Sequence, residues 1–522
     1  MKRIVGLVIV LVVSAAAGLP IGIIDTIGGT VYDMSTICAG QQRMVYYDPG
    51  YGVHVAWTWS VDFTGTTFPD RNVRYNFRSD STGQWSWLDT NYMQSGMPVF
   101  AERSGYGAID LDPVTHCITI SRHGGVPIHP SVARDVAPGS GVFEYADGTP
   151  AADNMQWPWL AVTSTGTIHV FAMTAAYLLG YSRISAWPQF EELVQGWDPG
   201  TTFPNHLVTA SKRSGRVATT WNDDAQPIAS LYVRKSEDDG VTWQTPEQVP
   251  LPDAFGGDTL ESISICSLGA LFDRDDRYNI VAAIMPVVHD TGYTVPIEVW
   301  QYREGRDPLW TRIHRAGCAP GHLQGELGYN TLYAARPKLA QDPTTGRFCA
   351  IWSQFDSANV ETTTDRLRAD VWCSTSPDGF HWSPGVNLTG PDSATEMYCD
   401  IAPIVNDTMH IVYQADLQAG MRVMGEGIAT PNPIVYLKVP VSTVAVAEGR
   451  QMPDAGRATP ELAPNPCRWA VTLRGTEPVV LFDGTGRRAA VLVPGRNDVS
   501  ELNPGVYFWT AANHRGKVVV ER

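Results

Sequence analysis

Short stretches in which apolar residues alternate with polar or small ones recur along this chain, and clusters of turn-forming residues separate them. The stretch that starts at His206, HLVTASKRSGRVATTW, predicts two strands joined by a turn at Ser214 and Gly215. A third strand is predicted at Leu231 to Lys235. The 17 Trp, 48 Gly and 37 Pro residues suit many short strands and turns rather than long helices, so we expect an all-β protein.

Seven strand-turn-strand units of this kind occur, and their turns recur roughly every 50 to 70 residues. Several are followed by a further predicted strand, at residues 73–77, 231–235, 298–302, 369–373 and 434–438. This spacing predicts the four-stranded blades of a β-propeller, with seven blades expected and six as the alternative. A β-sandwich, or two stacked all-β domains, would show the same alternation. The seven units begin at Arg43, Gly107, Trp159, His206, Gly269, Pro337 and Ile401.

The segment from Ile24 to Tyr32 precedes the first unit and has the pattern of one more strand. In a ring of blades it could pair with the predicted strand at Ile434 to Lys438 in the last blade. That pairing would leave no open sheet edge, which is the reason to expect it.

A compact turn motif, SEDDGVTW, follows the third strand of the fourth unit. The Ser236 and Asp238 side chains can hydrogen-bond the backbone of a tight turn, Gly240 supplies a positive φ, and Trp243 fills the apolar gap beneath. The motif resembles the Asp-box of the sialidase-like (BNR repeat) β-propellers, and two degraded copies, SDSTGQW and SPDGFHW, also follow predicted third strands. In that family the boxes lie on the outer rim and help folding, so we expect a structural role for these residues.

The resemblance implies catalytic chemistry only if the enzyme's residues are present. A working sialidase uses three arginines to clamp a carboxylate, a Tyr-Glu pair as nucleophile and base, and an Asp as acid. The family's Phe/Tyr-Arg-Ile-Pro string is missing here, and the nearest fragment, Arg183-Ile184-Ser185, lies in a different unit. Sialidases also have six blades rather than seven. Both departures count against sialidase activity and leave another glycosidase open.

Ligands of propellers usually bind where the innermost strands meet at the axis, so residues just ahead of the first strands are the candidate site. Trp157 and Trp159 could stack on a sugar ring or pack within a blade. Arg336 could bind a carboxylate or satisfy loop carbonyls. Glu261 and Asp400 could form an acid-base pair only if their carboxyls lie about 5 to 9.5 Å apart, and are otherwise solvated loop carboxylates. The candidates are Arg103, Trp157, Trp159, His206, Glu261, Arg336, Tyr398 and Asp400.

Charge and cysteine content narrow the classes of partner. Asp plus Glu outnumber Lys plus Arg by 54 to 38, and no Lys/Arg run could follow a phosphate backbone, so nucleic acid is not an expected partner. The eight cysteines lack zinc-like spacing; we expect mostly buried thiols, with one or two disulfides as an option in an exported protein. The acidic turn at Asp273 continues with Arg277 and Tyr278 instead of calcium-loop residues, so neither a metal nor a cofactor is expected.

The first 17 residues have the three parts of a secretory signal peptide. MKR is followed by an apolar run from Ile4 to Val13 and by the small residues SAAAG. The apolar run is too short to span a bilayer comfortably, although an uncleaved anchor is the alternative reading. No later segment is apolar enough to cross a membrane, so we expect an exported protein.

After residue 446 the composition changes to Pro, Gly and Ala, which predicts a linker at residues 447–466 and a propeller at residues 18–446. Residues 467–522 predict a small β-sandwich. Its DGTG turn, LNPGVYF string and KVVVER ending resemble the sorting domain of the bacterial type IX secretion system. The resemblance implies recognition by the type IX machinery and release from, or attachment to, the bacterial cell surface; a plain stabilising module is the alternative. The residues that carry it are Pro504, Gly505, Tyr507, Lys517 and Arg522.

These patterns favour a secreted or cell-surface propeller that binds a glycan or a surface protein without catalysis. The alternatives are an exo-acting glycoside hydrolase of sialidase-like architecture and a structural surface-layer protein. A pocket at the axis lined by three arginines and a Tyr-Glu pair would favour the enzyme. A shallow or closed axis would favour the binding protein.

Overall fold

The computed structural model describes residues 20–36, 41–148, 154–176, 178–191, 193–195, 197, 205–223, 230–255, 262–319, 321–445, 461–463, 467–474, 479–483, 487–511 and 514–521. The chain divides into two compact units, residues 1–445 and 446–522. The predicted signal peptide, Glu261 and Arg522 lie outside the described residues.

The described part of the first unit forms seven antiparallel sheets, which we number as blades 1 to 7. Blade 1 contains β2 (Val45–Asp48), β3 (Gly52–Trp59), β4 (Asn72–Ser79) and β5 (Met97–Pro98). Blade 2 contains β6 (Ser104–Gly105), β7 (Ile109–Leu111), β8 (Ile118–Gly124), β9 (His129–Asp135) and β10 (Phe143–Asp147). Blade 3 contains β11 (Met155–Val162), β12 (Ile168–Thr174), β13 (Leu179–Ile184) and β14 (Val194–Gln195). Blade 4 contains β15 (His206–Ala210), β16 (Val217–Asn222), β17 (Leu231–Ser236) and β18 (Glu247–Val249).

The remaining three blades complete the series. Blade 5 contains β19 (Ser262–Phe272), β20 (Tyr278–Val288), β21 (Thr291–Gly292), β22 (Ile297–Arg303) and β23 (Trp310–Ala316). Blade 6 contains β24 (Ala334–Gln341), β25 (Phe348–Glu361), β26 (Arg366–Ser376) and β27 (Val386–Asn387). Blade 7 contains β28 (Thr395–Ile401), β29 (Thr408–Asp416), β30 (Asn432–Pro440) and β1 (Ile23–Thr30). The short helices are η1 (Tyr92–Gln94), η3 (Arg422–Met424) and α1 (Val441–Ala445).

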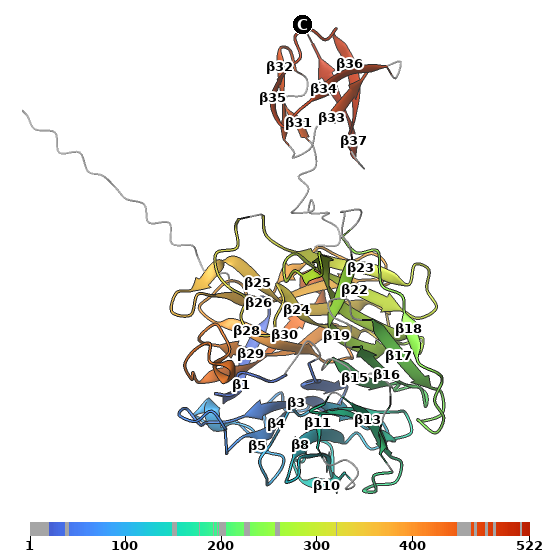
Figure 1. Ribbon diagram of the computed structural model, residues 1–522, viewed down its shortest axis with the longest axis vertical. Helices are drawn as coiled ribbons and strands as arrows, with labels where there is room; N and C mark the ends of the chain where they lie inside the picture. Colours follow the sequence, from blue (N-terminus) through green and yellow to red (C-terminus); the bar gives the residue numbers. More distant parts are fainter. Residues whose placement is uncertain are drawn as a thin grey trace, which may run out of the picture. The chain divides into compact units, whose positions relative to one another are not determined.

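The blades form a closed ring. The innermost strands contact one another in the order β2, β7, β11, β15, β19, β24, β28 and back to β2. In Figure 1 the colours follow this order from blue β3 through green β15 to orange β28. The first unit is therefore a seven-bladed β-propeller, and each of the seven predicted hairpins forms the innermost strand of a blade and the strand beside it.

The N-terminal strand closes the ring. β1 pairs antiparallel with β30, from Ile23 opposite Lys438 to Thr30 opposite Asn432. It becomes the outermost strand of blade 7, as the sequence predicts. Because β1 comes from the other end of the propeller segment, the first and last parts of that segment are hydrogen-bonded to each other.

Burial follows from the position of each strand in the ring. β2, β15 and β24 are buried along their whole length, because neighbouring blades cover both of their faces. Large aromatic side chains fill the space between blades; Trp57, Trp221 and Trp352 are each at most 1% exposed. Six cysteines are described as free thiols, and all but Cys318 are buried.

The second unit is a small sandwich of two sheets. One sheet has the order β31 (Glu461–Ala463), β32 (Ala470–Arg474), β35 (Gly495–Asp498), and the other β34 (Arg488–Leu492), β33 (Val479–Phe482), β36 (Gly505–Ala511), β37 (His514–Val520). Leu473, Leu481, Trp509 and Val518 belong to the core between them. β31 pairs with β32, so residues 461–463 belong to the module and not to the linker predicted at 447–466.

The predicted sorting residues lie on or beside the last two strands of this module. Pro504 and Gly505 are exposed at the start of β36. Tyr507 points into the core, where its hydroxyl donates to the Asn503 carbonyl at 2.8 Å. Lys517 is exposed on β37, opposite Phe508. Within the described ranges, no helix combines the length and the apolar character that a membrane span would need.

Candidate functional site

Four innermost strands carry the same backbone irregularity near their start. Tyr106, Trp157, Arg336 and Tyr398 have φ angles of 55°, 51°, 54° and 55°. At the last three the pairing register shifts by a bulge, between residues 156 and 159, 335 and 338, and 397 and 400. A non-glycine residue at positive φ costs about 1 to 3 kcal/mol, and such strain gathers at functional sites. We call the end of the propeller where these residues lie the strand-start face.

The layer of side chains below the bulges closes the axis. The Lys338 ammonium of blade 6 lies 5.0 Å from the centre of the Trp159 indole of blade 3. These two blades lie on opposite sides of the propeller axis. It also donates to the Gln41 carbonyl and lies 3.9 Å from the Asp400 carboxylate. Asp400 accepts from the backbone N–H of Met44 at 2.6 Å. Side chains from opposite blades therefore meet at the axis.

A second polar layer lies further along the innermost strands. Asp110 of blade 2 accepts from Lys212 of blade 4 at 2.8 Å and from Arg43, ahead of blade 1, at 3.1 Å. The Lys212 ammonium also donates to the Val162 carbonyl of blade 3 at 2.6 Å. Four blades are tied together by these two cations and one carboxylate.

The candidates named from the sequence thus separate into two groups. Trp159, Arg336, Tyr398 and Asp400 are 1% to 6% exposed, and only Trp157 among the described axial candidates stays half-buried. Trp157 packs against the core cluster of blades 3 to 5 and against a second cluster that joins blades 7, 1 and 2. His206 supports it, with its Nε2 3.0 Å from the Trp157 carbonyl oxygen. Arg103 is exposed and donates to the Phe68 and Thr67 carbonyls.

A small cavity opens beside Tyr398, between blades 6 and 7. Its volume of about 30 Å³ has room for one or two water molecules and not for a sugar ring. Two loops border it, residues 325–333 ahead of β24 and residues 416–430 between β29 and β30. Its lining is Asp33, Leu327, Gly328, Tyr329, Thr331, Phe355, Leu367, Thr395, Met397, Tyr398, Asp416, Gly420, Met421 and Glu426.

Two buried carboxyl groups line this cavity. Asp33 and Asp416 are 5% and 6% exposed. Burial raises the pKa of Asp33 to about 6, although its hydrogen bonds from the backbone N–H groups of Arg422 and Val423 lower it. Burial, and then the negative charge of Asp33, raise the pKa of Asp416 well above its ordinary value. At neutral to mildly acidic pH one group can therefore hold a proton while the other is charged.

Arg336 lies next to the same cavity as a buried cation. It is 1% exposed, and its guanidinium makes only long hydrogen bonds, to the Thr331 hydroxyl at 3.4 Å and the Asn330 carbonyl at 3.3 Å. The Tyr398 ring lies 4.7 Å from the guanidinium carbon. Among the described residues no carboxylate forms an ion pair with Arg336.

Three arginines gather at blades 1 and 2 around His123. Burial, and then the positive charges of Arg71, Arg103 and Arg122, hold the pKa of His123 well below its ordinary value. Arg71 donates to the Tyr32 hydroxyl at 3.1 Å, and that hydroxyl lies 2.6 Å from the hydroxyl of Tyr106. Arg71 and Arg122 are buried. The Tyr32 and Tyr106 hydroxyls contact each other and Arg71, so the described residues of this group show no Tyr-Glu pair of the kind that a sialidase needs; Arg103 stays exposed.

Apolar side chains surround the cavity mouth. Glu426 joins the two bordering loops, because its carboxylate accepts from the backbone N–H groups of Tyr329 and Met421, each at 3.0 Å. Arg422 of the second loop donates to the Gly65 carbonyl at 2.8 Å, which brings the loop of Phe63 alongside. The exposed apolar residues of these three loops, which we call the rim, are Phe63, Tyr329, Leu417, Met424 and Ile428, at 40% to 70% exposure.

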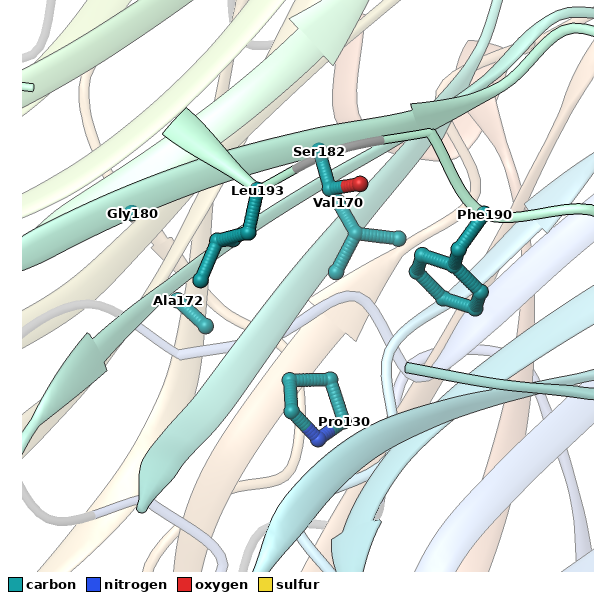
Figure 2. Close-up of a pocket in the computed structure, with 7 residues that line it drawn as sticks. All are labelled: Pro130, Val170, Ala172, Gly180, Ser182, Phe190 and Leu193. Atoms are coloured by element: carbon teal, nitrogen blue, oxygen red, sulfur yellow. The ribbon is translucent and has the colours of Figure 1, made fainter. Parts of the chain in front are cut away.

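A second cavity is a packing gap between blades 2 and 3. It has a volume of about 10 Å³ and lies among Pro130, Val170, Ala172, Gly180, Ser182, Phe190 and Leu193. Figure 2 shows these side chains pointing at one another between strands, with the Ser182 hydroxyl as the single side-chain polar group. A void without a charged or titratable side chain offers neither catalysis nor specific polar recognition.

The Asp-box residues form a tight turn after β17. The Ser236 hydroxyl accepts from the Gly240 N–H at 2.9 Å, and Asp238 accepts from the Thr242 N–H at 2.8 Å. Gly240 has φ 73°. Trp243 packs edge-on against the Tyr181 and Trp197 rings of blade 3. The turn thus connects blade 4 to blade 3 and lies at the opposite end of the strands from the bulges.

Asp33, Asp416 and Glu426 were not among the sequence candidates. Asp33 follows β1 and Asp416 ends β29; these two strands lie on either side of β30 in blade 7 and end at the same face, which brings both acids together. That signal depends on the pairing of β1 with β30 in blade 7. The described residues contain no group of three or more His, Cys, Asp or Glu side chains arranged to hold a metal ion.

Comparison with known proteins gives similarity in fold. No protein-family profile matches the chain, and no curated protein sequence matches it. The polysaccharide lyase Uly1 is 9% identical over 78% of this chain and 92% of the lyase, with a TM-score of 0.47. A PL25 ulvan lyase bound to -[GlcA(1-4)Rha3S]- is 12% identical over 83% and 98%, with a TM-score of 0.46. The BP39L lectin from Burkholderia pseudomallei is 11% identical over 76% and 99%, also with a TM-score of 0.46.

Proposed function

We propose that this protein is a binding propeller without catalytic activity, which holds a glycan or a surface protein at the rim of the strand-start face. The observation that carries the proposal is the closed axis. Lys338 meets Trp159 and Asp400 there, and Asp110 meets Lys212 and Arg43 one layer further along. The polar groups at the axis are already engaged with one another.

The rim supplies a surface suited to such binding. Phe63 and Tyr329 are 46% and 41% exposed on loops that Arg422 and Glu426 hold in place. Exposed aromatic side chains on fixed loops bind with little loss of conformational freedom, and they dominate many recognition surfaces. Exposed apolar groups around a polar depression are also the pattern expected of an interaction site.

A glycoside hydrolase is the second candidate, and one observation favours it. Asp33 and Asp416 face the same cavity with raised pKa values, so one protonated and one charged carboxyl group could act as acid and base. The cavity of about 30 Å³ would have to open for a sugar ring to reach them, through movement of loop 416–430.

The binding proposal is tested with the purified chain on a glycan array, followed by titration of any ligand found. Tyr329→Ala should weaken that ligand's affinity about tenfold, which corresponds to about 1.4 kcal/mol. Tyr51→Ala is the matched control, because Tyr51 is also 41% exposed but lies at the turn between β2 and β3. Equal affinities for both variants would contradict the assignment of the rim.

The enzyme candidate is tested on a panel of aryl-glycosides that includes sialosides. Turnover that disappears in both Asp33→Asn and Asp416→Asn, while Asp147→Asn keeps it, would replace the binding proposal with a hydrolase. Asp147 is an exposed carboxylate on β10. Absence of turnover on the whole panel, together with a ligand from the array, is the expected outcome.

Export by a cleaved signal peptide and recognition of residues 467–522 by the type IX machinery remain our proposal for localisation. The motifs quoted from both ends of the chain support it. Mass spectrometry of the protein from culture medium and from the cell surface would test both parts. An N-terminus at residue 18 and a C-terminus near the linker are expected; a cytoplasmic, full-length chain would contradict them.

A further inference from the structure

The C-terminal module has an apolar face that its own core does not use. In the sheet of β34, β33, β36 and β37, the core face buries Leu481, Trp509, Val518 and their neighbours. The opposite face should be polar in a sheet with one side in water. Instead it carries six apolar side chains, which we call the apolar strip: Val480, Phe482, Val491, Val506, Phe508 and Val519.

The strip is continuous across the sheet. Val480 lies opposite Val491, Phe482 opposite Phe508, and Val506 opposite Val519 in direct cross-strand pairs. Side chains in such pairs touch, so the pairs join four strands into one surface. Phe508, Val506 and Val491 are 52%, 45% and 41% exposed.

The sequence of these strands also indicates that both faces of the sheet are meant to be covered. VVLF in β33, VYFW in β36 and VVV in β37 are continuous apolar runs, which are typical of strands covered on both faces. The module covers one face only. An exposed, contiguous apolar surface of this kind marks an interaction site.

Cationic side chains flank the strip on both sides. Arg488 lies on β34 opposite Phe482, and Lys517 lies on β37 opposite Phe508; both are exposed. β34 and β37 are the two edge strands of the sheet. Two copies packed face to face would bring cationic edges against cationic edges, which opposes self-association. A negatively charged surface complements both edges at once.

We propose that the apolar strip, with Arg488 and Lys517 at its edges, is a docking surface for an anionic phospholipid membrane. Apolar side chains would enter the boundary between headgroups and acyl chains, while the two cations contact lipid phosphates. Each such cation contributes about 1 kcal/mol near an anionic membrane, which is about a fivefold change in binding. The docking surface is separate from the rim of the propeller and does not depend on the function proposed for it.

The test is co-sedimentation of the full chain with vesicles of phosphatidylcholine alone and with vesicles containing phosphatidylglycerol. Binding to the phosphatidylglycerol vesicles, weakened by salt, is the expected result. Phe508→Ser and Arg488→Glu should each reduce binding at least fivefold. Leu88→Ser and Arg213→Glu are matched controls on the propeller, since Leu88 is 54% exposed and Arg213 is also exposed, and neither belongs to the rim; they should bind as the unaltered chain does.

Thermal unfolding of each variant checks that the module stays folded, which the exposed positions of Phe508 and Arg488 favour. No vesicle binding by the unaltered chain would overturn the proposal. It would also be overturned if the two control variants lost as much binding as Phe508→Ser and Arg488→Glu. A concentration-dependent dimer in sedimentation velocity that Phe508→Ser dissolves would assign the strip to a second copy instead. Binding to phosphatidylcholine as strong as to phosphatidylglycerol would overturn the role of the cations.

Discussion

Asp370 on β26 and Glu396 on β28 bring two carboxyl groups within hydrogen-bonding reach of each other at the seam between blades 6 and 7. Both residues are 3% exposed. Asp370 Oδ2 accepts from the Asn387 amide at 2.7 Å, whereas Asp370 Oδ1 and Glu396 Oε2 receive no donor among the described residues. A proton held between those two oxygens would supply the missing donor.

This pair predicts that stability falls as pH rises. Burial raises the pKa of Asp370 to about 6 and that of Glu396 well above its ordinary value. Between about pH 4 and pH 6 the folded chain keeps a proton that the unfolded chain releases, so the free energy of unfolding decreases over that window. From Asp370 alone the expected loss is on the order of 2 kcal/mol. Urea unfolding at pH 4.5 and pH 7.5 measures it.

Asp370→Asn should remove most of this dependence. Its amide can donate to Glu396 and accept from Asn387, which mimics the protonated acid. The variant should be more stable than the unaltered chain at pH 7.5 and similar to it at pH 4.5. Asp147→Asn, at an exposed position on β10, should leave both values unchanged. Equal pH dependence in Asp370→Asn and the unaltered chain would show that the pair does not share a proton.

Lys338 at the axis predicts that the free energy of unfolding increases with pH at high pH, the opposite of the effect of Asp370 and Glu396. Burial lowers the pKa of Lys338 to about 8, although Asp400 raises it. Between about pH 8 and pH 10.5 the folded chain binds fewer protons here than the unfolded chain, so this group adds stability as pH rises. Guanidinium unfolding at pH 7 and pH 9.5 should show that contribution in the unaltered chain and not in Lys338→Met.

Lys338→Met should also destabilise the propeller at pH 7, by about 3 kcal/mol, because Asp400 would keep a buried charge without its cation. The double variant Lys338→Met, Asp400→Asn should recover part of that loss. Lys438→Met, on β30 away from the axis, should cost much less. If the double variant is no more stable than the single one, Asp400 does not depend on Lys338 for its charge balance.

The seven blades and their closure could be predicted from the sequence because they rest on local signals. Hairpin turns such as Ser214-Gly215 fix the register of two strands at a time, and the repeat of that unit fixes the architecture. β1 was predictable for a related reason: an edge on the last blade needs a strand, and Ile24 to Tyr32 was the segment left to provide it.

The candidate site was predicted less completely, because it depends on which blades meet across the ring. Sequence position placed Trp159, Arg336 and Asp400 near the axis, and they lie there. It could not show that Lys338, only two residues after Arg336, reaches Trp159 in a blade on the other side of the ring. Asp33 and Asp416 are 383 residues apart in number, and only the pairing of blade 7 brings them together.

The Asp-box turn predicts a variant that lowers stability without affecting binding. Trp243 packs edge-on against Tyr181 and Trp197, and its indole N–H donates to the Gly240 carbonyl at 3.1 Å. Trp243→Ala should cost about 2 kcal/mol, less than a fully buried Trp, because the side chain is half-buried. Chemical unfolding of the propeller, and the affinity for any ligand found at the rim, are the two measurements.

Trp469→Ala provides the comparison for that variant, since Trp469 is 66% exposed in the C-terminal module. It should leave the unfolding of the propeller unchanged. A loss of ligand affinity in Trp243→Ala under conditions where the variant is folded would contradict a purely structural role for the Asp-box.

Glu426 predicts a graded loosening of the cavity mouth. Its Oε2 accepts from the Tyr329 and Met421 N–H groups, and its Oε1 lies 3.3 Å from the Arg366 guanidinium. Glu426→Gln can keep the two backbone hydrogen bonds but loses the ion pair, whereas Glu426→Ala loses all three contacts. Hydrogen bonds to a charged group contribute about 1.5 to 3 kcal/mol, so local opening should increase at least tenfold in Glu426→Ala and less in Glu426→Gln.

Amide hydrogen exchange of the loops at residues 325–333 and 416–430 measures that opening. If the rim binds ligand in the arrangement seen here, affinity should fall in the same order, from the unaltered chain to Glu426→Gln to Glu426→Ala. Glu237→Ala, at an exposed carboxylate in the Asp-box turn of blade 4, serves as the control for both measurements. Faster exchange with unchanged affinity would place the ligand elsewhere, while unchanged exchange in Glu426→Ala would show that other contacts hold the two loops together.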